Sequence, residues 1–156
     1  MNWLTLVLRL IHVGGGAMWV GMFAFMTFYL SPALAEVGPE GGKLMAALQR
    51  RRIMVVLPVI ALLTIGSGFW LMMRVYGGPA NLAASRMGIA LNVGATAAIV
   101  AFLIGIIFMR PAMMRAMATT DPAEAQRLRV RGAVLGRWVA RLLMLALGAM
   151  AVARYL

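Results

Sequence analysis

The amino-acid sequence predicts an all-α integral membrane protein, a bundle of four transmembrane helices. Of its 156 residues, 63% are hydrophobic and 12% are charged, with only four Asp or Glu in the whole chain. A soluble domain has about 25% charged residues, so the charge needed to cover such a surface is missing here. Four apolar stretches each reach the roughly 20 residues that cross a bilayer core. They are residues 3–30, 53–76, 87–109 and 134–155.

The first apolar stretch, residues 3–30, is expected to stay in the protein as a helix. Ala33-Leu34-Ala35 resembles a signal-peptide cleavage site, but no basic segment precedes the apolar run, which is also too long for a signal peptide. None of the four stretches alternates apolar and polar residues as a barrel strand does. All four should therefore be helices, which satisfy their backbone hydrogen bonds internally in lipid.

Basic residues are unevenly divided between the two ends of these stretches. Two links carry most of them, namely Lys43, Arg50, Arg51, Arg52, Arg110, Arg115, Arg127, Arg129, Arg131 and Arg137, with Arg141 one turn further on. The other end has Arg9, Arg74, Arg86 and Arg154. Basic links face the cytoplasm, so both termini are predicted to lie on the outer side. The net charge of +11 then indicates contact of this cytoplasmic collar with anionic lipids, and not with nucleic acid.

The second and fourth helices are expected to extend into the cytoplasm. Asp121 followed by Pro122 is typical of a helix start, which predicts one helix from there into residues 134–155. A similar extension over residues 43–52 should lead into the second stretch. No repeat or linker divides the chain, so residues 1–156 should form a single domain.

The single histidine, His12, lies within the first apolar stretch. An ionisable group at that depth is a candidate functional residue, because hydrocarbon cannot solvate it. Helical spacing places Gly16, Trp19 and Phe23 on the same face, with Arg9 beside them. At the same depth the other stretches carry small residues, which are Gly66, Ser67, Gly68, Gly94, Ala98, Ala146, Gly148 and Ala149. These residues either pack the helices closely or leave a space for a flat ligand.

Two interpretations of His12 follow. A neutral imidazole in such a space is the kind of axial ligand that haem iron uses. Arg9 would then contact the propionates, although lipid phosphates are alternative partners for it. In the other interpretation, His12 hydrogen-bonds Thr64, Ser67 or Asn92 and binds no metal.

Methionine is abundant, with fifteen residues, while cysteine is absent. Thioethers select Cu(I), and Met18, Met22 and Met26 recur every four residues. Methionine is also an ordinary filler of apolar interfaces. Copper movement across the membrane is therefore an alternative function.

The first two stretches resemble a known family. Arg9-Leu-Ile-His12, Trp19-Val-Gly21 and Leu30-Ser31-Pro32 are similar to the first helix of the copper-resistance D (CopD) superfamily, which includes the HemJ-type protoporphyrinogen oxidases. The likeness continues through residues 58–71. It implies a four-helix protein of a bacterial-type inner (plasma) membrane. In the HemJ branch the histidine that matches His12 would bind haem b, and in the CopD branch it would be associated with copper.

Three functions thus compete. The first is a haem b protein, redox or porphyrin-related, with His12 as metal ligand, Arg9 near the propionates and Gly16, Trp19 and Phe23 around the ring. The second is copper transport or resistance, and the third is a non-catalytic accessory subunit of a larger membrane complex; a homo-oligomer is compatible with each. No catalytic residue can be assigned, because no Ser-His-Asp set or carboxylate pair is present, so any chemistry would belong to a cofactor.

Overall fold

The structure is a computed structural model that describes residues 2–156, in which no strand occurs. Four helices are long and apolar enough to cross a membrane: Trp3–Glu36, Ile53–Tyr76, Arg86–Ala118 and Pro122–Ala153.

The first of these four helices comprises α1 (Trp3–Phe25), a π-helical turn (Met26–Leu30) and α2 (Ser31–Glu36). The third comprises α6 (Arg86–Ile104), a π-helical turn (Gly105–Met109) and α7 (Arg110–Ala118), while α4 (Ile53–Tyr76) and α8 (Pro122–Ala153) are the second and fourth. An all-α fold with four helices long and apolar enough to cross a membrane is confirmed for the described residues.

The first and third helices continue beyond their predicted ends at residues 30 and 109. In each, a π-helical turn lies just before a proline, Pro32 or Pro111. A proline inside an α-helix has no N–H to donate and its ring clashes with the carbonyl four residues earlier. The wider π turn lets the helix pass the proline, because the Ser31 and Arg110 amides donate to carbonyls five residues back.

The predicted extension over residues 43–52 is helical but does not run into the second span. It forms a separate helix, α3 (Pro39–Arg50), and the chain turns at Arg51 and Arg52 before α4 begins. Arg52 adopts a left-handed conformation with φ 58° and ψ 27°, which costs a non-glycine residue about 1–2 kcal/mol. The expectation of one continuous extended helix is therefore wrong here, although α4 itself has the predicted bounds.

The long fourth helix begins where the sequence predicts. Asp121 caps it, since its Oδ1 accepts a hydrogen bond of 2.9 Å from the Ala123 amide. Thr119 Oγ1 donates to the Glu124 carboxylate at 2.6 Å, which ties the preceding turn to the first turn of α8. A single helix thus carries Arg127 to Arg137 and then enters the apolar part of the bundle.

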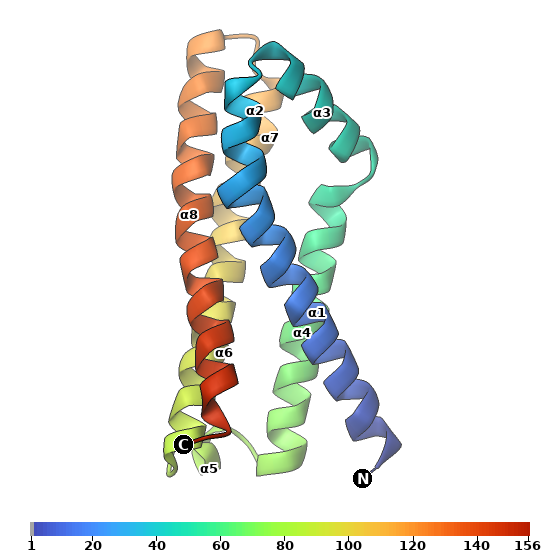
Figure 1. The fold of residues 1–156 in the computed structure, drawn as a ribbon, viewed down its shortest axis with the longest axis vertical. Helices are drawn as coiled ribbons and strands as arrows, with labels where there is room; N and C mark the ends of the chain where they lie inside the picture. Colours follow the sequence, from blue (N-terminus) through green and yellow to red (C-terminus); the bar gives the residue numbers. More distant parts are fainter. Residues whose placement is uncertain (1) are drawn as a thin grey trace.

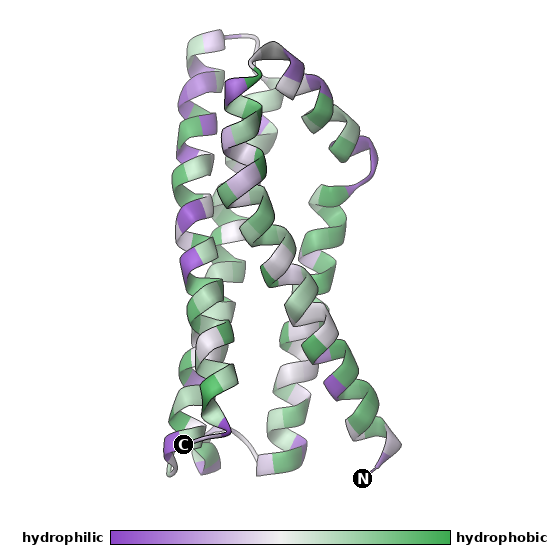
Figure 2. Ribbon diagram, viewed as in Figure 1, coloured by the Kyte–Doolittle hydropathy of each residue, from purple (hydrophilic) through white to green (hydrophobic). Residues whose placement is uncertain are grey.

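Both termini lie at one end of the bundle, and α2, α3 and α7 lie at the other (Figure 1). The short helix α5 (Pro79–Leu82) connects α4 to α6 at the terminal end. Hydrophilic residues gather on the turn around α3 and along the half of α8 nearest to it, whereas the middle of the bundle is apolar (Figure 2). The basic collar of the sequence is thus gathered at one end of the molecule.

The helices form two closely packed pairs. The most extensive contacts join α6 to α8 and α1 to α4. The pairs meet in a small core of Trp19, Ala61, Ala101, Val139 and Leu143, to which all four membrane-spanning helices contribute. Large apolar side chains elsewhere point outward along every span, as expected of surfaces that contact lipid.

The turn between α2 and α3 depends on a buried glycine. A Cβ added to Gly41 would lie 2.6 Å from the Leu34 carbonyl oxygen, whereas one added to Gly42 meets nothing within 4 Å. Gly41→Ala should therefore push α3 away and destabilise the protein by about 1–3 kcal/mol. Gly42→Ala should be neutral or slightly stabilising, because alanine favours the helix. Thermal unfolding of both variants in detergent measures the difference, and equal midpoints would contradict this account of the turn.

Candidate functional site

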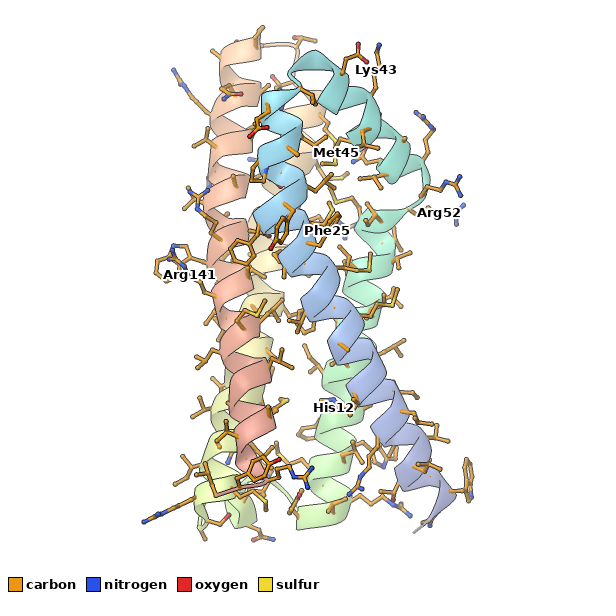
Figure 3. The ribbon with its side chains drawn as sticks, viewed as in Figure 1. His12, Phe25, Lys43, Met45, Arg52 and Arg141 are labelled. Carbon is orange, nitrogen blue, oxygen red and sulfur yellow. The ribbon has the colours of Figure 1, made fainter. Side chains whose placement is uncertain are left out.

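His12 lies on α1 where this helix crosses α4, and its ring is half-buried between the two (Figure 3). The Nδ1 atom lies 2.8 Å from the backbone carbonyl oxygen of Thr64. Two glycines of α1 allow this approach. A Cβ added to Gly15 would lie 2.6 Å from Thr64 Oγ1, and one added to Gly16 would lie 3.5 Å from Thr64 Cγ2. The close crossing of α1 and α4 is thus built on small residues next to the histidine.

The imidazole ring of His12 packs directly on Gly68 of α4. A Cβ added at this position would lie 2.5 Å from Cε1 and 2.7 Å from Nδ1 of His12, closer than real side-chain atoms approach. The ring therefore rests against the bare backbone of α4. Any residue other than glycine at position 68 would have to displace it.

The hydrogen bond fixes the tautomer of neutral His12. A carbonyl oxygen only accepts, so Nδ1 carries the proton and donates it to Thr64, which leaves the lone pair on Nε2. Nε2 has no hydrogen-bond partner within residues 2–156. It is also not fully buried, because every fully buried side-chain nitrogen or oxygen of a non-exposed residue there has a partner. The ring is thus anchored through one nitrogen while the other remains accessible as a ligand atom.

The hydroxyl groups near His12 are satisfied within α4 itself. Thr64 Oγ1 donates to the Ile60 carbonyl at 2.8 Å, and Ser67 Oγ donates to the Leu63 carbonyl at 2.6 Å. Ser67 Oγ also lies 3.1 Å from the Thr64 carbonyl that His12 uses. The sequence suggested the side chain of Thr64, Ser67 or Asn92 as partner, but the bond goes to the backbone of Thr64.

The structure brings some predicted site residues to His12 and places others elsewhere. Gly16 contacts Thr64, and Arg9 is exposed on α1 one turn from His12 with no ion pair in the described part of the chain. Trp19 is 4% exposed and is packed in the core between the helix pairs, with Phe23 against that core. The two aromatic rings thus serve the bundle core beyond the histidine.

The small residues of the four helices do not surround one space, which favours the packing alternative over the space for a flat ligand. Gly94 faces α8, where an added Cβ would lie 3.1 Å from the Ala146 carbonyl oxygen. An added Cβ on Gly66 or Gly148 meets nothing, and Gly148 lines a groove between α6 and α8. Small residues in α6 and α8 therefore pack these helices together, and only Gly15, Gly16 and Gly68 shape the surroundings of His12.

Two methionines at the arginine-rich end, Met109 and Met113, act as packing residues. A Cβ added to Gly132 would lie 3.1 Å from Met113 Sδ, and one added to Gly136 would lie 3.8 Å from Met109 Cε. These two methionine side chains therefore occupy the space next to Gly132 and Gly136 of α8, where the glycines carry no side chain. Within residues 2–156, no group of three or more His, Cys, Asp or Glu side chains could hold a metal ion. His12 Nε2 is the candidate ligand atom that the geometry supports.

Sequence reasoning placed Gly68 at the depth of His12, but it did not predict that the ring packs on Gly68, that Gly15 faces Thr64, or that the Thr64 carbonyl is the partner. The run Gly14-Gly15-Gly16 and the flanking of Ser67 by two glycines were the available signals. They indicate close helix approach in general, but they do not say which glycine faces which helix.

Comparisons of the chain with family models, with curated proteins and with solved structures found no match.

Proposed function

We propose that this chain is an integral membrane haem b-binding protein, redox or porphyrin-related, in which His12 Nε2 is an axial ligand. The hydrogen bond from His12 Nδ1–H to the Thr64 carbonyl, with Nε2 left free, carries the proposal. Metal-ligating histidines almost always donate their other ring N–H to a carbonyl, a carboxylate or water, which fixes the tautomer and raises ligand basicity. A half-buried histidine that served only packing would leave Nε2 without a hydrogen bond in an apolar span, which costs free energy and gains nothing.

Other residues of this chain support the same role. Gly68 holds the ring against α4, so that rotation about the side-chain bonds is restricted by backbone on one side. Arg9 lies one turn from His12 and, without an acidic partner in the described residues, is available for a propionate carboxylate. The packed core around Trp19 joins the two helix pairs. It includes residues of both α1 and α4, and it therefore helps to fix their relative position beside His12.

Bound haem would supply one-electron redox chemistry, and the protein would supply binding and electrostatics. No group of three or more His, Cys, Asp or Glu side chains that could hold a metal ion lies within residues 2–156, so the proposal rests on His12 and assigns any chemistry to the haem. We place the protein in a bacterial-type inner membrane with both termini outside and the arginine-rich end in the cytoplasm, as a member of the CopD and HemJ-type superfamily. The positive-inside distribution of arginine supports this orientation.

The absorption spectrum and metal content of the purified protein test the proposal. We expect a Soret band, about one haem b per chain and no stoichiometric copper when purification avoids chelators. Copper without haem would overturn the proposal in favour of copper transport, for which the methionines of α1 are the candidate ligands. Protein that remains colourless and metal-free after haem is added to its membranes would overturn it in favour of an accessory subunit.

A further inference from the structure

An arginine pair lies on the outward face of α8, away from α1 and α4. Arg137 and Arg141 are both exposed and are one helical turn apart, so their side chains are neighbours. Figure 3 shows Arg141 pointing away from the bundle. Trp138 lies beside them with 54% of its surface exposed, and the Arg141 guanidinium carbon is 5.0 Å from the centre of its ring. No acidic group pairs with either arginine within residues 2–156.

The pair lies at the edge of the apolar zone. A Cβ added to Gly136 would lie 3.8 Å from Met109 Cε, so Arg110, which follows Met109 at the end of the apolar run of the third span, lies near the level of Arg137. Arg141 is about 6 Å further along α8 toward the termini. A guanidinium one turn inside this edge is costly in hydrocarbon unless it reaches an anion at the interface. Tryptophan beside it is typical of the headgroup level of a membrane.

An apolar groove begins beside Arg141, at the next residue of α8, and runs toward the termini. Leu142 and Leu145 of α8 line it together with residues of α6 that include Val93, Ala97 and Val100. It continues along the same face past Gly148 and Val152. From Leu142 to Ala153, where α8 ends, the helix rises about 17 Å, which accommodates most of one extended acyl chain.

We infer that this face binds one anionic phospholipid, with its phosphate on Arg137 and Arg141 and an acyl chain in the groove between α6 and α8. Two adjacent guanidiniums without counter-ions suit a phosphate group, which accepts several charge-assisted hydrogen bonds. A second copy of this chain is a poor occupant, because the two arginine pairs would repel each other. The site is separate from His12, and it is more specific than a general attraction of the basic collar for anionic lipid.

Lipid binding to the delipidated protein in neutral detergent tests the headgroup half of the site. Native mass spectrometry would count phosphatidylglycerol or phosphatidylcholine of the same acyl chains bound per chain. Each arginine near the surface contributes about 1 kcal/mol, so Arg137→Gln with Arg141→Gln should weaken the first phosphatidylglycerol roughly 30-fold. Phosphatidylcholine should be weakened much less, because its choline cation offsets the phosphate charge. Arg127→Gln with Arg129→Gln removes the same charge from the same helix, about 12 Å or more from the pair, and should change binding by less than about threefold.

Two further measurements fix the identity of the occupant. Gly148→Leu fills the groove at a position where an added Cβ meets nothing within 4 Å, so it should lower phosphatidylglycerol retention without unfolding the protein. Inorganic phosphate should not displace the lipid, since it lacks an acyl chain. Equal weakening by the two arginine double variants would overturn the site in favour of general collar charge. Unchanged retention in Gly148→Leu, or full displacement by phosphate, would overturn the groove.

Discussion

Alanine at position 68 is expected to expel the His12 ring from α4 and to weaken haem binding roughly 10–100-fold, as loss of the partner of a metal-ligating histidine typically does. The added methyl carbon would lie 2.5 Å from His12 Cε1, and α4 presents rigid backbone there. The imidazole must therefore move, and its 2.8 Å bond to the Thr64 carbonyl is lost with it. Haem content and the Soret absorbance of the purified variant, with haem titration of the apoprotein, measure the effect.

Gly66→Ala is the matched control for this substitution. It makes the same change two residues earlier in α4, where an added Cβ meets nothing within 4 Å. Haem retention should then match the original chain, with slightly raised stability because alanine favours a helix over glycine. On the proposed function, His12→Ala removes the axial ligand and should abolish the Soret band altogether. If Gly68→Ala and Gly66→Ala retain haem equally, His12 is not held as the structure indicates or is not the ligand.

The outcome separates ligand binding from folding. Gly68→Ala removes one hydrogen bond and perturbs the packing of α1 on α4, so some loss of stability is expected with or without haem. The diagnostic result is a fall in haem affinity that exceeds any fall in unfolding temperature of the apoprotein. The single variant His12→Leu keeps an apolar side chain on α1, so it should fold with near-original stability but bind no haem.

The membrane spans were predictable because their physics is local. A span requires only a sufficient run of apolar residues, and the second stretch, 53–76, reproduces the bounds of α4. The start of α8 was also local, since Asp121 and Pro122 act on the turn that follows them. These features need no knowledge of which helix lies next to which.

The sequence did not predict features that depend on which helices are neighbours, or on a strained backbone conformation that the rest of the fold stabilises. The first apolar stretch was predicted to end at residue 30, yet a π turn carries the helix past Pro32. Arg52 suggested a continuing helix, yet it adopts a left-handed conformation that sequence rarely assigns to arginine. The depth of His12 was predictable, but its partner was not, because pairing α1 with α4 gives the glycines of α6 and α8 a different role.

Gly88 at the start of α6 is expected to be the glycine least tolerant of substitution. A Cβ added there would lie 1.7 Å from the Leu82 carbonyl oxygen and 2.3 Å from its carbon, which is overlap with backbone. That carbonyl is held in place, since it accepts hydrogen bonds from the Ser85 amide at 3.1 Å and from Ser85 Oγ at 3.3 Å. The connection between α5 and α6 cannot shift without breaking these bonds.

Gly88→Ala should therefore destabilise the protein by about 3–5 kcal/mol, because it also lifts Leu82, which is 3% exposed, out of its packed position. The gain in helix propensity, about 1 kcal/mol, is too small to offset this. Gly105→Ala, later in the same membrane-spanning helix, places its methyl group in open space and should not lower stability. Unfolding midpoints in detergent measure both, and proteolysis of the connection at residues 77–85 separates local opening from global unfolding. A Gly88→Ala protein with an unchanged midpoint and a protected connection would show that α5 does not pack against α6 as described.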